Sequence, residues 1–239
     1  MNAAPVQGIV FDKDGTLFDF ATTWEAFTVA FLMRITGRDQ ARAAQIGQAI
    51  GFDLNAHQFA RDSIVIAGTP AEIAQAIAAH VPDMTHTALV EMLNLEAQMA
   101  PQAEAVDLGP FLEGLRARGL ALGVATNDAE APARAHLDTA QVTGHFDFIA
   151  GFDSGFGGKP APGQLLGFCA AMGLPPENVV MVGDSLHDLK AGRAAGMRTV
   201  GVLTGVAQAH ELTDWAEAVF PDIGHIPDWL DRMGAAEAI

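Results

Sequence analysis

Residues 6–19 constrain the fold of this chain more than any other segment, because an apolar run leads directly into two aspartates, a glycine and a threonine. Ile9, Val10 and Phe11 are typical of a strand that is covered on both faces of a sheet. Gly15 suits a turn that needs an unusual backbone angle. The sequence therefore predicts a buried strand that ends in a polar loop, with the chemistry located where the strand stops.

Asp12 and Asp14 are two positions apart, so on a continuing strand their side chains would share one face and repel each other. A hard dication with oxygen ligands would relieve that repulsion. A surface loop with two solvated acids is the alternative that this short pattern leaves open. A calcium-binding loop is a poor match, because Thr16, Leu17 and Thr23 stand where an acid or amide, a glycine and a glutamate are needed.

The composition of the 239-residue chain bounds its class. Half of the residues are hydrophobic, which allows one large domain or two modest ones with a sizeable core. Thirteen basic residues against 29 acidic ones give a net charge of −16. This charge argues against binding to nucleic acid or to an anionic membrane. An anionic substrate would need a local cluster of positive charge, such as a metal ion, one lysine and helix amino termini.

The single cysteine, Cys169, lies in an apolar pattern and is interpreted as a core residue rather than a nucleophile. No apolar run approaches the ~18 residues that a membrane span requires, and no secretory pattern opens the chain. We therefore expect a cytoplasmic protein.

Residues 21–100 show a series of amphipathic helical patterns without a strand-like run. Helices are expected over residues 40–50 and 57–66, and the string Thr-Pro-Ala-Glu at 69–72 predicts a capped helix start. This segment is predicted to be an all-helical domain, inserted after the first loop and closed by a return linker at 100–103. The residues of this inserted domain, called the cap, that are candidates to meet a substrate are Trp24, Arg34, His57 and Arg61.

From residue 101 onward strands and helices alternate, which is the signature of an α/β fold with a doubly wound parallel sheet. The predicted domains are a core of residues 1–20 and 101–239 and a cap of residues 21–100. Strands are expected over 120–125, 146–150, 179–182 and 199–203, with an edge strand over 218–220. In such sheets ligands gather outside the carboxyl ends of the strands.

Candidate functional residues lie at the ends of two of these strands and in one of the loops that connect strands and helices. Thr126 and Asn127 could donate to a phosphate oxygen, although a turn or helix cap is the alternative. Lys159 lies in a loop rich in glycine and proline, and a solvated charge is the alternative there. Asp184 and Asp188 are four apart, and a helix cap with an acid in the first turn is the alternative.

These four stretches, in this order, resemble the four motifs of the haloacid dehalogenase-like superfamily in its phosphatase form. Phe-Asp-Lys-Asp-Gly-Thr-Leu-Phe-Asp from residue 11 is similar to the first motif, and Thr126-Asn127 matches the second. Gly-Gly-Lys-Pro-Ala-Pro from residue 157 looks like the third, and Gly-Asp-Ser-Leu-His-Asp from residue 183 looks like the fourth. The branch that the chain resembles is that of phosphoglycolate phosphatases with a helical cap.

The resemblance implies a set of roles at the acids. Mg²⁺ would be held by the Asp12 carboxylate, the Asp14 main-chain carbonyl and Asp184, while Asp188 orients the metal shell. Asp12 would be the nucleophile that forms an aspartyl-phosphate, and Asp14 the general acid and base.

The resemblance also implies which residues bind the phosphoryl group. These are Thr16, Thr126, Asn127 and Lys159, and Lys159 would also pair with the nucleophile. The reaction expected from these roles is hydrolysis of a small phosphate monoester, phosphoglycolate-like or a sugar phosphate, by a monomer or homodimer that binds neither nucleic acid nor membrane.

Two residues differ from the usual motifs, and a third is an acid directly after the second motif. Lys13 replaces an apolar residue between the two aspartates and is expected to point away from them. Gly163 stands where many relatives carry aspartate, and is interpreted as a helix-start residue. Asp128 would disfavour strongly anionic leaving groups if its side chain faces the site. The alternative functions are a phosphoglucomutase-like isomerase on the same fold and a binding protein without catalysis.

Overall fold

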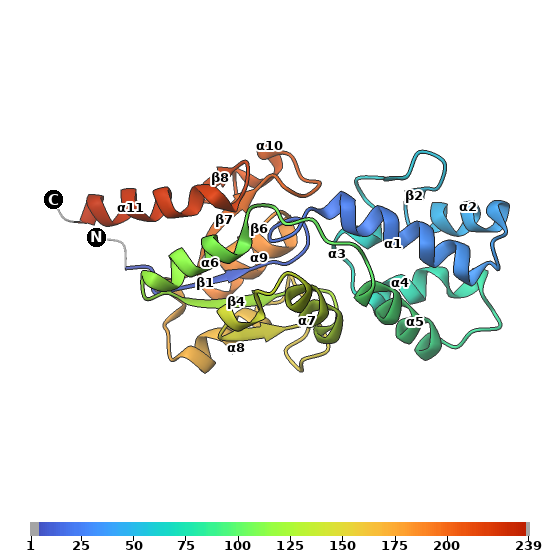
Figure 1. Ribbon diagram of the computed structural model, residues 1–239, viewed down its shortest axis with the longest axis horizontal. Coiled ribbons are helices and arrows are strands. Elements are labelled where there is room, and N and C mark those ends of the chain that lie inside the picture. The colour runs from blue at the N-terminus through green and yellow to red at the C-terminus, as the bar shows by residue number, and fades with distance from the viewer. Residues whose placement is uncertain (1–4, 238–239) are drawn as a thin grey trace.

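A computed structural model describes residues 5–237 and shows an α/β core with a helical insertion at one end (Figure 1). The insertion runs from α1 (Phe20–Ile35) to α5 (His86–Gln98) and follows directly on the loop after β1 (Gly8–Phe11). The chain re-enters the core before α6 (Leu108–Ala117). The exact division at residues 20 and 100 stays a prediction, which the positions of these elements support; residues 1–4, 238 and 239 lie outside the described chain.

The core contains one six-stranded sheet in the order β5-β4-β1-β6-β7-β8, and all neighbouring strands are parallel. Its other strands are β4 (Ala121–Ala125), β5 (Phe148–Ala150), β6 (Val179–Gly183), β7 (Arg198–Val202) and β8 (Ala218–Phe220). Strand β1 is central, with Ile9 opposite Leu122 on one side and Val180 on the other. All residues of β1 are buried, as a strand covered on both faces requires. The predicted doubly wound parallel sheet is confirmed.

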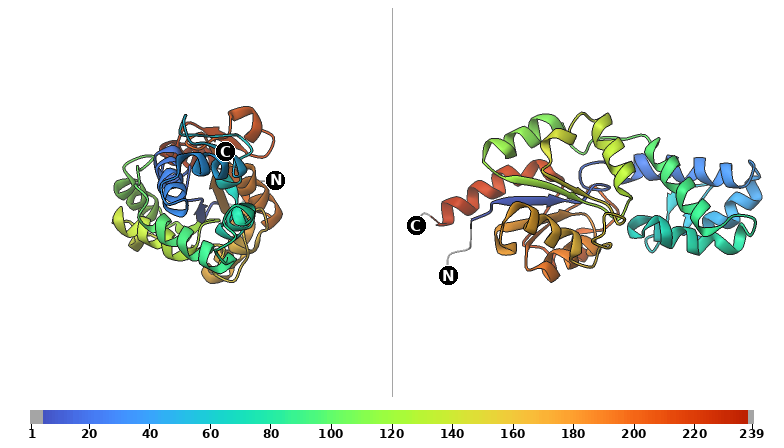
Figure 2. Two further views of the ribbon diagram at one scale, coloured as in Figure 1. Left: turned by 90° about the vertical axis from the view of Figure 1, so that its right-hand side faces the viewer. Right: turned by 90° about the horizontal axis from the view of Figure 1, so that it is seen from below.

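Helices cover both faces of the sheet, as the right-hand view of Figure 2 shows. On one face lie α6, α7 (Glu130–Thr139) and α11 (Ile226–Glu237), and on the other α8 (Gly163–Met172) and α9 (Leu186–Ala195). One hydrophobic cluster joins β1 to Leu112, Leu137 and Trp229, and a second joins β1 to Phe168 and Ala191. Alternate residues of β1 thus serve different faces. The short α10 (Ala209–Leu212) follows β7.

The insertion has a hydrophobic core of its own. Its remaining elements are α2 (Gln40–Ala49), the antiparallel two-residue strands β2 (Phe52–Asp53) and β3 (Gln58–Phe59), α3 (Ile64–Ala67) and α4 (Pro70–Ile77). The predicted cap at residue 69 is confirmed: the Thr69 hydroxyl accepts from the Glu72 N–H, and the Glu72 carboxylate accepts from the Thr69 N–H. The insertion is therefore helical, with one short strand pair that the sequence did not indicate.

The helix predicted over residues 57–66 is wrong. Helical structure begins only at Ile64. His57 has a φ of 54°, in the left-handed region that an α-helix excludes, and the Asp53 carboxylate accepts from the N–H of Asn55. A side-chain-closed turn between β2 and β3 therefore replaces the start of that helix.

Cys169 is a residue of α8 and is buried in the hydrophobic cluster between this helix and the sheet, in agreement with its interpretation as a core residue. Between residues 5 and 237 the structure contains no helix with the length and apolar character that crossing a bilayer requires.

Candidate active site

The carboxyl ends of the central strands meet at the edge of the sheet that faces the insertion (Figure 1). Asp12 directly follows β1, and its N–H donates to the Val182 carbonyl of β6 at 2.8 Å. Thr126 directly follows β4, and Asp184 directly follows β6. Parallel pairing of three adjacent strands is thus what gathers residues from distant parts of the chain.

Lys159 reaches this edge from the loop that precedes α8. Its Nζ lies 2.6 Å from Asp12 Oδ1 and 2.7 Å from Asp188 Oδ1, and the side chain is buried. Burial alone would lower the pKa of the lysine, but the charges of Asp12 and Asp188 raise its pKa above the usual value. The ammonium group is therefore positively charged and fixed between two carboxylates.

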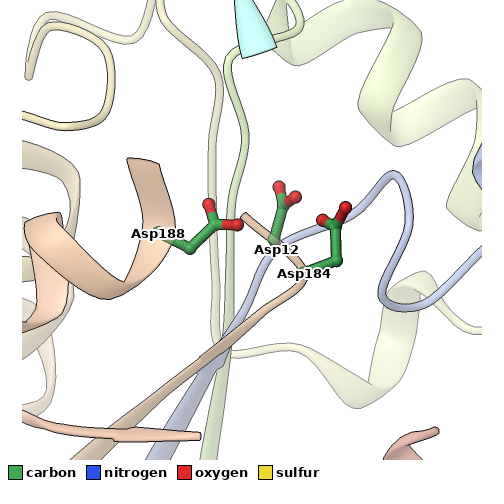
Figure 3. Close-up of side chains that lie close together, drawn as sticks. All are labelled: Asp12, Asp184 and Asp188. Atoms are coloured by element: carbon green, nitrogen blue, oxygen red, sulfur yellow. The ribbon is translucent and has the colours of Figure 1, made fainter. Parts of the chain in front are cut away.

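Asp12, Asp184 and Asp188 form a compact cluster of buried acids (Figure 3). Each offers an oxygen, and these atoms lie within 4.8 Å of one another. Burial and the neighbouring Asp188 raise the pKa of Asp12 to about 7, although Lys159 opposes this, and burial with the same repulsion raises the pKa of Asp184. Three crowded carboxylate oxygens are the kind of donor set that a hard dication such as Mg²⁺ prefers, and a dication would offset their repulsion.

Two glycines leave room for the Asp184 carboxylate. A Cβ at Gly15, whose φ is 79°, would lie 2.6 Å from Asp184 Oδ2, and a Cβ at Gly205 would lie 1.6 Å from the same atom. Thr204 holds the two loops together, because its hydroxyl donates to the Gly15 carbonyl at 2.6 Å. The backbone at Gly15 and Gly205 therefore lies so close to Asp184 that a side chain at either position would clash with its carboxylate. Such close packing fits a carboxylate that is kept in one position for an ion.

The residues of the second predicted motif, Thr126 and Asn127, line the site, and Asn127 also holds the loop that carries Lys159. The Asn127 side chain accepts from the Lys159 N–H at 2.7 Å and donates to the Lys159 carbonyl at 2.9 Å. The Thr126 hydroxyl accepts from the Asp128 N–H at 3.1 Å. These contacts hold the strand end after β4 against the loop that carries Lys159.

Lys13 does not point away from the two aspartates, as the sequence analysis expected. Its buried Nζ lies 2.7 Å from Asp14 Oδ1 and 3.5 Å from Asp128 Oδ2, and contacts His136 Nδ1 at 2.9 Å. Burial and the Lys13 charge lower the pKa of His136 to about 4, so the ring is neutral at pH 7. In that form Nδ1 accepts from Lys13, and Nε2–H donates to the Ala97 carbonyl of the insertion at 2.6 Å.

The two carboxylates beside Lys13 differ in position. Asp14 is partly exposed at the site, with 12% of its side chain accessible, whereas Asp128 is buried. Burial raises the pKa of Asp128 to about 6, with Lys13 opposing the shift and Asp14 adding to it. A buried cation thus separates two acids beneath the site.

A cavity lies between the sheet edge and the insertion. On the core side Asp12, Asp14, Thr126, Asn127 and Lys159 all line it. Asp184 lines an adjoining cavity that shares Lys159 with the first. With Asp188, which also lines this cavity, the structure brings six of the predicted site residues to one cavity and places a seventh, Asp184, beside it.

Several other predicted residues lie elsewhere. Thr16 is fully buried and is not among the described residues that line the cavity, so its substrate-binding role stays a prediction. Arg34 pairs with Glu96 at 2.6 Å, His57 is exposed in the turn between β2 and β3, and Arg61 lines the adjoining cavity. Trp24 alone of the four cap candidates lines the cavity with Asp12.

Gly163 is the first residue of α8, as interpreted from the sequence, and a Cβ there would lie 2.0 Å from the Phe156 carbonyl oxygen. His136, Thr204 and Gly205 were missed because they belong to no local pattern. Their contacts with Lys13, Gly15 and Asp184 arise only from the packing of distant segments.

Comparison with known proteins agrees with this geometry. Residues 6–196 match the family model for a haloacid dehalogenase-like hydrolase. Similar curated proteins include "Probable phosphatase IndB" of Dickeya dadantii, 31% identical over 97% of this chain and 94% of the relative, and "Phosphoglycolate phosphatase" of Rhodospirillum rubrum, 30% identical over 98% of this chain and 97% of the relative.

Among solved structures, a predicted phosphoglycolate phosphatase from Haemophilus somnus superposes with a TM-score of 0.72. It covers 93% of this chain and 97% of its own, and at 20% identity it shares the fold. The match to the family model spans most of the chain, and it includes every acid of the site described above. This chain therefore belongs to the haloacid dehalogenase-like hydrolase family.

Proposed function

We propose that the protein is a Mg²⁺-dependent phosphatase that hydrolyses a small phosphate monoester through a phosphorylated Asp12. The observation that carries this proposal is the Lys159 Nζ at 2.6 Å from the Asp12 carboxylate, at the carboxyl end of the central strand. The family match and the two relatives named as phosphatases support the reaction class. The name of the Rhodospirillum rubrum relative also makes phosphoglycolate a substrate to test.

The first step transfers the phosphoryl group to the protein. Asp12 Oδ forms a bond to phosphorus while the bond from phosphorus to the ester oxygen breaks, and Asp14 gives a proton to the departing alcohol oxygen. Lys159 holds the attacking carboxylate and offsets the negative charge of the phosphoryl oxygens. Thr126 and Asn127, which line the same cavity, are placed to bind those oxygens.

The second step returns the protein to its starting state. Asp14, now ionised, takes a proton from water as the water oxygen attacks phosphorus, and the bond to Asp12 breaks. Inorganic phosphate leaves, and Asp14 again carries a proton. One carboxyl group thus serves as acid and then as base.

Asp12, Asp184 and the Asp14 carbonyl would hold Mg²⁺, and the neighbouring Asp188 would orient the metal shell. When bound, the ion supplies positive charge that neutralises the acids and the phosphoryl oxygens. Two further properties, a cytoplasmic location and a monomeric or homodimeric state, stay predictions from the sequence.

The test is a panel of phosphate monoesters assayed for phosphate release with Mg²⁺ and with EDTA. We expect release from at least one ester, and a loss of ~10²-fold or more in EDTA, the scale for removal of an electrostatic stabiliser. The panel includes 2-phosphoglycolate, glucose 6-phosphate and p-nitrophenyl phosphate.

Each other outcome favours a named alternative. Interconversion of sugar phosphates with little phosphate release would favour the isomerase. Binding without turnover of any ester would favour a protein without catalysis. Unchanged release in EDTA would contradict the dependence on Mg²⁺.

A further inference from the structure

The wall of the active-site cavity that faces Asp12 from the insertion is apolar. Three aromatic residues of α1, Phe20, Trp24 and Phe27, line it at positions that share one helix face. Val65 and Leu93 extend this wall from α3 and α5. Among the described residues of the insertion that line the cavity, none is charged.

The aromatic residues form a continuous surface. The rings of Phe20 and Trp24 lie 6.4 Å apart, and those of Trp24 and Phe27 lie 4.9 Å apart in an edge-to-face arrangement. The Trp24 indole N–H is buried and has no hydrogen-bond partner within residues 5–237. A group held against this wall would therefore meet aromatic ring surface.

Among the described residues of the opposite wall, Lys159 is the one lysine or arginine and the exposed His187 is the one histidine. Lys159 is held by Asp12 and Asp188 at 2.6 and 2.7 Å, and the insertion-facing side of the cavity adds only apolar residues. Asp14 and Asp128 also line this space, so a carboxylate on the leaving group would lie near like charges. A buried charge without a partner is strongly disfavoured.

The basic side chains of the insertion lie away from this wall. Arg34 pairs with Glu96 and lines a different cavity. Arg61 lines the adjoining cavity together with four acids, Asp62, Glu72, Asp184 and Glu211. If an anionic leaving group were bound, Arg61 would therefore be the candidate basic residue of the insertion to pair with it.

We infer that the substrate is a phosphate monoester of an uncharged, predominantly apolar alcohol, aryl or alkyl. This inference rests on the proposed function, and it disfavours phosphoglycolate, whose carboxylate would be unpaired. It also disfavours sugar phosphates, whose several hydroxyl groups would lose their partners in water against an apolar wall.

The test compares kcat/KM for esters of similar primary alcohols, measured with Mg²⁺ at one pH. Benzyl phosphate and isobutyl phosphate carry uncharged groups, and isobutyl phosphate has nearly the shape of 2-phosphoglycolate. We expect both to exceed 2-phosphoglycolate and glucose 6-phosphate by ~10- to 10²-fold, the scale of an unsatisfied buried polar group. Equal values, or a preference for either anionic or sugar ester, would overturn the inference.

Variants at the junction of the two cavities sharpen the comparison. Ile66 is half-buried, packs against the core of the insertion and lines both cavities, so Ile66→Lys adds a cation there while its methylene stem retains part of the packing. We expect this variant to raise kcat/KM for 2-phosphoglycolate relative to isobutyl phosphate by ~10-fold, whereas the control Ile66→Met leaves the ratio near its starting value. If the natural protein prefers 2-phosphoglycolate and Arg61→Gln abolishes that preference, the substrate is selected by Arg61 and not by the apolar wall.

The outcomes separate this inference from the proposed function. Hydrolysis that favours 2-phosphoglycolate overturns the inference and leaves the phosphatase assignment standing. No release from any ester, with p-nitrophenyl phosphate included, overturns both.

Discussion

Asp12 is a buried acid whose surroundings have opposing effects on its pKa. Lys159 at 2.6 Å favours the ionised form, while burial and Asp188 favour the protonated form and raise the pKa to about 7. The unfolded chain would release this proton near the ordinary value of 3.8. In the metal-free protein the folded state therefore binds more protons than the unfolded state between about pH 4 and pH 7.

This difference predicts a pH dependence of stability with a definite sign. Because the folded state holds the extra proton, the contribution of Asp12 to the free energy of unfolding falls as pH rises through this window. In EDTA, urea unfolding of the natural protein and of Asp12→Asn should show a stability difference that shifts in favour of the variant from pH 4 to pH 7. Added Mg²⁺ should weaken this trend, and a difference that stays flat or moves the other way would contradict the assignment.

At the scale of elements, Lys13 joins the loop after β1 to α7 and, through His136, to the end of α5. The chain of contacts runs from Asp14 to Lys13 Nζ, then to His136 and the Ala97 carbonyl. Core and insertion are thus connected directly beneath the proposed acid of the reaction.

Replacement of this cation should destabilise the fold. Lys13→Met leaves the buried Asp128 and the neighbouring Asp14 without their counter-charge, and loss of one partner of a buried ion pair costs ~3–5 kcal/mol. We expect a loss of this size in the free energy of unfolding, measured with urea at pH 7. The double variant Lys13→Met with Asp128→Asn should recover part of it.

The outcome that would contradict this account is a loss below about 1 kcal/mol, the scale of an exposed ion pair. Such a result would mean that water reaches Asp128 and Asp14 in solution. The control is Arg118→Met, which removes the exposed partner of Asp231 and should change stability by no more than that amount.

At the scale of the whole molecule, the sequence predicts the core well because its strands are buried on both faces. The edge strand Ala218–Phe220 was predicted with the observed bounds, and β4 was predicted within one residue at its start. Parallel strands also fix where the site forms, because their carboxyl ends share one edge of the sheet, so the sequence alone predicts that Asp12, Thr126 and Asp184 lie together.

What the sequence could not predict depends on contacts between distant segments. The segment at residues 57–66 has a helical pattern, but the left-handed His57 and the Asp53-closed turn decide its structure. Lys13 appeared to face away from Asp14 because strand alternation says nothing about the bend of a loop. Gly205 gains its role only from the approach of Asp184.

The central claim is that Asp12 takes the phosphoryl group, and the most direct test is phosphate release by Asp12→Asn on the best ester of the panel with Mg²⁺. We predict a loss of ~10⁴-fold or more, the scale for a missing nucleophile, with an unchanged circular dichroism spectrum. Asp12→Ala, measured in parallel, guards against deamidation of the asparagine. Retained phosphate release in pure, folded samples of both variants would contradict the account.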